Sequence, residues 1–176
     1  MDAQTVSLII AAATLTIQDA ARFAYLTGWR RSEVVGLKWD MVNLDEGTIT
    51  LPTTKNKKPR TLHIAAEVLA IVKRREATRL VDGPDGEPHI AERAFHRRGR
   101  SLGDFKRACE TARIEAGLPD TLFHDLRRTA VRNLRRAGVP ESVAISVTGH
   151  KTRAVFDRYD IKSGGDQRKA LEQISN

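Results

Sequence analysis

Cysteine is nearly absent from this chain, since Cys109 is the only one in 176 residues. A disulfide framework is therefore excluded, which is typical of proteins kept in a reducing cytoplasm. Cys109 falls on the apolar side of an expected helix, so we interpret it as a core residue and not as a nucleophile. The length predicts one domain that buries a core of its own without disulfides or structural metal ions.

Long apolar runs are also missing. The most apolar stretch, residues 6–17, is interrupted by Ser7, Thr14 and Thr16. It is too short to span a bilayer, and it lacks the basic flank and cleavage site of a signal peptide. The sequence therefore predicts a cytoplasmic protein with no membrane partner.

The sequence also lacks a group of histidines with the spacing of metal ligands. His63, His89 and His96 show no such spacing, and we interpret them as surface or hairpin residues. We therefore expect no metal site and no cofactor.

Positive charge is abundant and unevenly distributed. The net charge is +8; residues 1–54 carry four basic and six acidic side chains, whereas residues 55–176 carry 26 and 16. Such asymmetry indicates a basic face that meets a polyanion. Nucleic acid is one such partner, but ribosomal or heparin-type binding would give the same charge distribution.

The pattern of apolar residues predicts an α+β fold, a mostly helical domain with one small antiparallel β-sheet. Glycines or prolines follow several of the expected helices, as is common at helix ends. The expected helices cover residues 16–27, a short segment from 32, and residues 65–80, 102–116, 124–137, 140–148 and 152–159.

The sheet is expected between the second and third helices. Residues 48–51 and 60–64 alternate with β-branched side chains around a polar turn at 55–59, which predicts a β-hairpin. Residues 42–44 are a candidate third strand. Residues 82–88, rich in glycine and proline, are expected to form the least ordered loop.

The expected helix at 124–137 combines histidine and arginine on one face. His124 and Arg127 are three residues apart in the sequence, about one helical turn. Arg128 and Arg132 add charge to the same helix. Taken alone, this pattern is also that of a solvated basic helix.

Polar residues elsewhere in the chain change that interpretation. Arg30 lies in the stretch Thr-Gly-Trp-Arg-Arg-Ser-Glu at 27–33, and Lys55 lies at the tip of the expected hairpin. His150 follows a glycine, and Tyr159 comes nine residues later. In this order the motifs resemble the catalytic domain of the tyrosine recombinases, the phage integrase family. The resemblance runs over residues 19–161.

The resemblance implies a site-specific DNA recombinase or integrase that works through a covalent 3′-phosphotyrosyl intermediate, without metal or ATP. Tyr159 is implied to be the nucleophile. Arg30 and Arg127 are implied to hold the non-bridging phosphate oxygens, which two guanidiniums can do in a bidentate manner. His150 is implied to donate a further hydrogen bond.

Proton transfer is implied to involve two further residues. A phenol has a pKa near about 10, so Tyr159 needs help to ionise, and His124 is implied to accept its proton. Lys55 is implied to protonate the departing 5′-oxygen. Lys57 is the alternative to Lys55 in the same turn. Glu33 is expected to support Arg30.

Several features keep other interpretations open. Val155 and Phe156 precede Tyr159, so taken alone this tyrosine resembles a core aromatic residue. Thr148 replaces the apolar residue that usually precedes Gly-His in the family, and Trp29 is larger than the usual aliphatic residue at its position.

The residues expected to contact DNA are Lys57, Lys58, Arg60, Arg128 and Arg132.

Two alternative functions remain at this stage. Residues 125–158 resemble a helix-turn-helix module of a non-catalytic DNA-binding protein, and a type IB topoisomerase would share the tyrosine chemistry. The catalytic domain is expected over 1–162, with a hinge and a short helix at 163–176 as a candidate protomer-exchange tail. The family's N-terminal core-binding domain is expected to be absent from this chain.

The partner implied by the resemblance is double-stranded DNA. We expect a homo-tetramer on DNA for the full-length protein and a monomer for this chain without DNA. The resemblance also implies a bacterial source, with the protein encoded by a prophage or mobile element.

Overall fold

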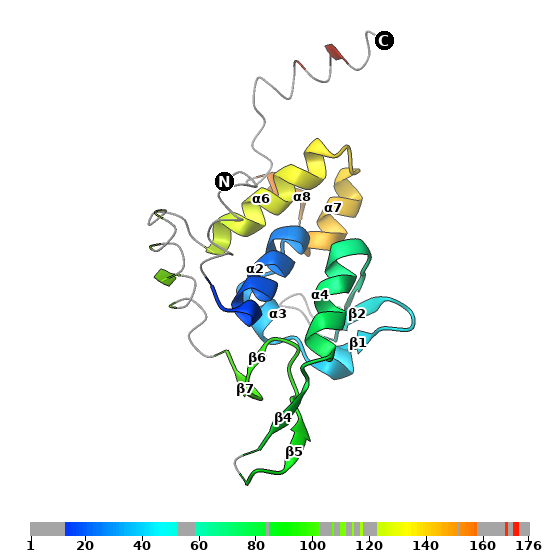
Figure 1. The fold of residues 1–176 in the computed structure, drawn as a ribbon. Helices are drawn as coiled ribbons and strands as arrows, with labels where there is room; N and C mark the ends of the chain where they lie inside the picture. Colours follow the sequence, from blue (N-terminus) through cyan, green and yellow to red (C-terminus); the bar gives the residue numbers. More distant parts are fainter. Residues whose placement is uncertain are drawn as a thin grey trace.

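A computed structural model describes residues 13–52, 59–83, 85–102, 123–150 and 152–157, and single positions from 107 to 117 and from 168 to 172. Helices and short antiparallel strands make up these segments, so the prediction of an α+β fold is confirmed (Figure 1). No helix in the described part is long and apolar enough to cross a membrane. The helices are α2 (Leu15–Thr27), α3 (Arg31–Val35), η1 (Trp39–Met41), α4 (Ala66–Glu76), α6 (Phe123–Arg136), α7 (Glu141–Thr148) and α8 (Arg153–Asp157).

The expected hairpin and its third strand are both present. β1 (Val42–Asn43), β2 (Thr48–Leu51) and β3 (Arg60–His63) form one antiparallel sheet in that order. Ile49 pairs with Leu62, and both are buried. Residues directly opposite each other in an antiparallel pair point to the same face of the sheet, here the core face. Residues 53–58, which include Lys55, Lys57 and Lys58, lie outside the described residues.

The structure contains strands that were not expected from the sequence. β4 (Leu80–Asp82) pairs with β5 (Pro88–Ile90), and β6 (His96–Arg97) pairs with β7 (Arg100–Ser101). The expectation of a loop over 82–88 was therefore wrong at both ends, where Asp82 pairs with Pro88. The paired residues Leu80 and Ile90 are 66% and 59% exposed. Strands so short and exposed leave no buried–polar alternation to detect.

Helix α2 lies at the centre of the described part. It packs against α3, α4 and α6 (Figure 1). Its residue Phe23 is fully buried and meets Trp29 and Phe95 edge-on, with ring centroids 5.3 and 5.5 Å apart. Each such aromatic residue contributes about 1.5–3 kcal/mol by burial. The central helix thus fixes the turn that follows it, which carries Trp29.

A smaller cluster joins the C-terminal helices. Val131 of α6, Ala144 of α7 and Phe156 of α8 are fully buried together. Thr152 precedes α8, and its hydroxyl accepts a hydrogen bond from the backbone N–H of Val155 at 3.3 Å. The description of this helix ends at residue 157. Only single positions of the expected tail are described, and Tyr159 and the expected hinge lie outside the described residues. The same holds for Cys109 and for most of the expected helix at 102–116.

Candidate active site

The turn after α2 is built on a glycine. Gly28 ends the helix with φ +66°, the left-handed region that disfavours residues with a side chain. A Cβ atom there would lie 2.9 Å from Cγ2 of Thr148 and 3.2 Å from Cβ of Ala130. The end of α2 therefore touches both α6 and α7 at this point.

Arg127 joins this turn to the end of α7. Its side chain is buried, and Nη1 donates hydrogen bonds to the carbonyl oxygens of Gly28 and Thr148, the latter at 2.6 Å. Trp29 Nε1 also donates to the carbonyl of Val147 at 3.1 Å. Two turns that are more than 100 residues apart in the sequence are thus held side by side.

Arg30 lies between these turns. Its Nη1 donates to Oε1 of Glu33 at 3.0 Å and to the carbonyl of Gly149 at 3.5 Å. The other Glu33 oxygen accepts the backbone N–H of Arg30 at 2.8 Å. The Arg30 side chain is 36% exposed, so a ligand can reach it from solvent.

Arg60, at the start of β3, occupies the interior of the same cluster. Its guanidinium carbon lies 4.7 Å from the ring centroid of Trp29, and Nη2 donates to Glu33 at 3.3 Å. A Cβ atom on Gly149 would lie 1.1 Å from Nη1 of Arg60. Burial lowers the pKa of Arg60, and Glu33 opposes that change. The Arg60 side chain is only 12% exposed. Its expected contact with DNA remains a prediction.

His150 is the buried histidine of the cluster. Its ring packs edge-on against Phe156, with centroids 5.4 Å apart. The pKa of His150 is lowered to about 3, first by burial and then by the positive charges of Arg127 and Arg30. The imidazole is therefore neutral at pH 7.

His124 stands at the exposed start of α6. Its ring is nevertheless partly shielded from water, and this shielding, followed by the charges of Arg127 and Arg128, lowers its pKa below the ordinary value. Arg30 also acts on His124, and Arg60 and His124 both act on His150. The structure therefore brings Arg30, Arg60, His124, Arg127 and His150 into one electrostatic cluster.

Such a cluster can bind an anion and transfer protons. Guanidiniums supply fixed positive charge and directed donors, which suit the oxygens of a phosphate. A neutral imidazole such as that of His124 can accept a proton from a neighbouring group. No group of three His, Cys, Asp or Glu side chains that could hold a metal ion occurs within the described segments.

Of the remaining expected site residues, two lie on α6 and the others lie outside the described part. Arg128 is exposed on α6 and pairs with Asp125 at 3.4 Å, and Arg132 Nη2 donates to the Thr129 hydroxyl at 3.3 Å. Lys55, Lys57, Lys58 and Tyr159 belong to the undescribed residues.

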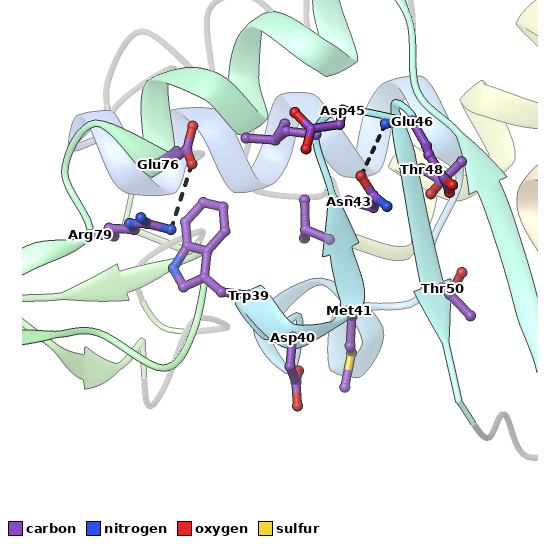
Figure 2. A pocket seen from close by; sticks show the side chains of 12 residues that line it. Trp39, Asp40, Met41, Asn43, Asp45, Glu46, Thr48, Thr50, Glu76 and Arg79 are labelled. Carbon is purple, nitrogen blue, oxygen red and sulfur yellow. Dashed lines mark hydrogen bonds and ion pairs between the residues drawn. The ribbon is translucent and has the colours of Figure 1, made fainter.

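A separate hollow of about 620 Å³ lies over β1, β2 and the end of α4 (Figure 2). Carboxylates line it, including Asp40, Asp45, Glu46 and Glu76. A phosphodiester would be repelled there, because like charges at short range oppose one another. The hollow contains none of the expected site residues.

Thr148 and Trp29 were noted in the sequence only as departures from a family pattern. In the structure the Thr148 carbonyl anchors Arg127, and its hydroxyl lies 2.7 Å from His150 Nδ1. Trp29 carries Arg60 on its ring. In the sequence, only the position of Thr148 and Trp29 next to motif residues indicated that they belong to the site. Neither a threonine nor a tryptophan by itself predicts contacts with arginine or histidine.

Comparison with known proteins gives a consistent result. The family model described as "Phage integrase family" matches residues 1–163. The integrase of Salmonella phage P22 is 25% identical over 158 residues, covering 81% of this chain and 38% of the phage protein. A "probable integrase/recombinase" of Methanocaldococcus jannaschii is 25% identical over 142 residues, covering 77% of this chain and 43% of that protein. The chain thus spans less than half the length of these curated relatives.

Solved structures share the fold. The XerA recombinase superposes with a TM-score of 0.79 at 21% identity, covering all of this chain and 63% of that one. A lambda integrase dimer bound to a COC′ core site superposes with a TM-score of 0.73 at 19% identity, covering 93% of this chain and 48% of the integrase. At these identities the likeness concerns the fold alone.

Proposed function

The chain belongs to the phage integrase family, and from this premise we propose that it is the part of a site-specific recombinase that breaks and rejoins DNA. The observation that carries the proposal is the pair of turns joined by Arg127. Arg30 there reaches the carbonyl of Gly149, next to His150, although 119 residues separate Arg30 from Gly149.

Binding of the scissile phosphate is assigned to the two arginines. Arg30 is open to solvent, and Arg127 is held in orientation through its Nη1 contacts. Donors fixed before the reaction stabilise charge that develops on the non-bridging oxygens, by about 3–4 kcal/mol each. Arginine side chains supply the positive charge that this stabilisation needs, so no step of the proposed reaction requires a metal ion or ATP.

In the proposed covalent step the phenol of Tyr159 attacks phosphorus. A bond forms between Oη and phosphorus, and the bond from phosphorus to the 5′-oxygen breaks. The phenol proton passes to His124, whose lowered pKa keeps it neutral and able to accept. Lys55 supplies a proton to the leaving 5′-oxygen. Rejoining reverses these steps, with a 5′-hydroxyl as nucleophile.

Double-stranded DNA is the proposed partner. Structures of lambda integrase hold DNA as a dimer on a core site and as a tetramer on a Holliday junction. We carry this over as a proposal that the full-length protein assembles on DNA and that this chain is monomeric without it. Arg128 and Arg132 on α6, with Lys57, Lys58 and Arg60 of the hairpin, are the proposed additional DNA contacts. The phage relative supports a mobile-element origin and, with it, a cytoplasmic site of action.

A covalent-capture experiment tests the proposal. The 176-residue chain is incubated with a pool of nicked duplexes whose sequence is randomised around the nick. Such suicide substrates trap the intermediate, because the short fragment released after cleavage diffuses away. We expect a protein–DNA adduct that resists SDS in wild type and is absent in Tyr159→Phe.

The second of the two tyrosines provides a matched control. Tyr25 is buried in α2, and its hydroxyl accepts a hydrogen bond from Asn133 at 2.9 Å. Tyr25→Phe removes the same hydroxyl from a position outside the cluster and should keep the adduct. No adduct with wild type, or an adduct that survives Tyr159→Phe, would contradict the proposed function.

A further inference from the structure

The hydroxyl of Thr148 makes two short contacts at the end of α7. Thr148 is fully buried, and its Oγ1 lies 2.7 Å from the carbonyl oxygen of Ala144 and 2.7 Å from Nδ1 of His150. A hydroxyl carries one proton, and a carbonyl oxygen can only accept. The Thr148 proton is therefore used on Ala144, so Nδ1 of His150 must donate to Oγ1.

This assignment determines the tautomer of the histidine. A neutral imidazole has one N–H, and the hydrogen bond of one ring nitrogen decides the state of the other. His150 is neutral because it is buried among positive charges. With the proton on Nδ1, Nε2 carries a lone pair.

We propose that Thr148 is a positioning residue that holds His150 as the Nδ1–H tautomer, so that Nε2 must take up a proton from solvent when the phosphodiester binds. The proposal rests on the proposed function and changes one part of it. A lone pair on Nε2 repels a phosphate oxygen. His150 can therefore donate a hydrogen bond to the scissile phosphate only after Nε2 has taken up a proton.

The charges around His150 agree with this order of events. Arg127 and His124 act on it from α6, Arg30 from the turn before α3, and Arg60 from β3. All of them oppose a positive imidazole. A bound phosphodiester is negative and favours the protonated form, since an opposite charge nearby stabilises the charged state.

Nitrogen NMR of the imidazoles gives a direct test that needs no DNA. In the whole chain at pH 7 we expect pyrrole-type Nδ1 and pyridine-type Nε2 shifts for His150, assigned with His150→Gln among the five histidines. Thr148→Val removes the hydroxyl at similar volume and should move population to the Nε2–H form. Thr148→Ser keeps a hydroxyl and should restore the wild-type pattern.

Thr129→Val is the control for a general disturbance of packing. Thr129 is also buried, and its hydroxyl makes the same bond to a carbonyl four residues earlier, at 2.8 Å to Asp125. This variant should leave the His150 shifts unchanged. An Nε2–H pattern in wild type, or an unchanged pattern in Thr148→Val, overturns the inference.

Cleavage kinetics on captured DNA test the consequence for the reaction. We expect the rate constant of adduct formation in wild type to fall as the pH rises above 7, by up to about tenfold per pH unit, because Nε2 must take up one proton. Thr148→Val should weaken this fall, because its Nε2–H form donates without that proton. Thr148→Ser should recover the wild-type pH profile, and the affinity for DNA should stay within about twofold. Equal pH profiles in wild type and Thr148→Val would overturn the role of Nε2. If wild type forms no adduct, the proposed function fails, and the NMR result still decides the tautomer.

Discussion

Two carboxylates of this protein each hold a pair of arginines, but with different results. Asp19 of α2 binds Arg74 and Arg75 of α4, with the shortest contact 2.6 Å to Arg74. Glu33 of α3 binds Arg30 and Arg60 at 3.0 and 3.3 Å. The chemistry of the pairs is the same.

The surroundings decide what each group does. Arg75 is buried, and its Nε donates a hydrogen bond to the carbonyl of Ala94 at 3.4 Å. The Asp19 group therefore joins α2 to α4 and to the chain around Ala94. The Glu33 group instead lies against Gly149, next to His150. An ion-pair cluster can thus serve either to join helices or to hold charged side chains next to a histidine, depending on which backbone it touches.

Removing the charge of Asp19 should give the largest change in stability. Asp19→Asn leaves Arg75 buried without its counter-charge, which costs about 3–5 kcal/mol in the free energy of unfolding. Urea denaturation followed by circular dichroism measures this loss. Glu33→Gln should cost less, because its partners Arg30 and Arg60 are 36% and 12% exposed, whereas Arg75 is 5% exposed. Equal losses for the two variants would mean that both groups are mainly structural.

Replacing the exposed arginine of each group should separate their roles in the reaction. Arg30→Ala is expected to slow adduct formation by about 10²–10³-fold, the usual effect of removing a preorganised donor. Arg74 is 46% exposed and pairs with Asp19, so Arg74→Ala is the matched control and should leave the rate unchanged. A similar slowing in both variants would show a general loss of folding instead of a lost phosphate contact.

The close approach of Arg60 to Gly149 can be tested by a double-mutant cycle. Gly149→Ala introduces a Cβ that collides with the guanidinium, at a residue with φ +66°. Overpacking of this kind typically costs about 1–3 kcal/mol. Arg60→Ala removes the collision, so the double variant should be more stable than the sum of the two single changes by at least about 1 kcal/mol. Additive thermal-unfolding data would contradict this geometry.

Acidification should affect both groups, because each has a buried histidine. Burial and Arg75 lower the pKa of His96, as burial and Arg127 lower that of His150. Below the ordinary pKa of 6.5 the unfolded chain binds a proton at each histidine, whereas the folded chain does not. The free energy of unfolding therefore falls as the pH falls from 6.5, and for His150 it falls until the pH reaches about 3. The slope is at most about 1.4 kcal/mol per pH unit for each histidine.

The matching variants separate the two histidines. His96→Gln and His150→Gln should each flatten the decline in unfolding free energy between pH 6.5 and 4.5, measured by urea titration. Only His150→Gln should also change the pH profile of adduct formation. An unchanged decline in His150→Gln would contradict the lowered pKa of that residue.

Local features of the fold could be predicted because short-range interactions determine them. Gly28 and Gly149 end α2 and α7 in the left-handed conformation, as expected for a glycine after a helix. The hairpin register follows from alternation at Ile49 and Leu62. The pairs β4–β5 and β6–β7 were missed because their short strands depend on chain packing and carry little pattern of their own.

The sequence by itself identified the family motifs, the helices that carry them and the order of the candidate site residues. These depend on spacing within a few turns of chain. Only the tertiary structure decided that Arg60, one member of a basic run, is covered by Trp29 and Gly149. It also brought the Thr148 hydroxyl within 2.7 Å of Nδ1 of His150, the contact from which the proton position is inferred. Burial and electrostatic surroundings come from groups that are distant in the sequence, such as Trp29 and Val147, 118 residues apart, so no local pattern records them.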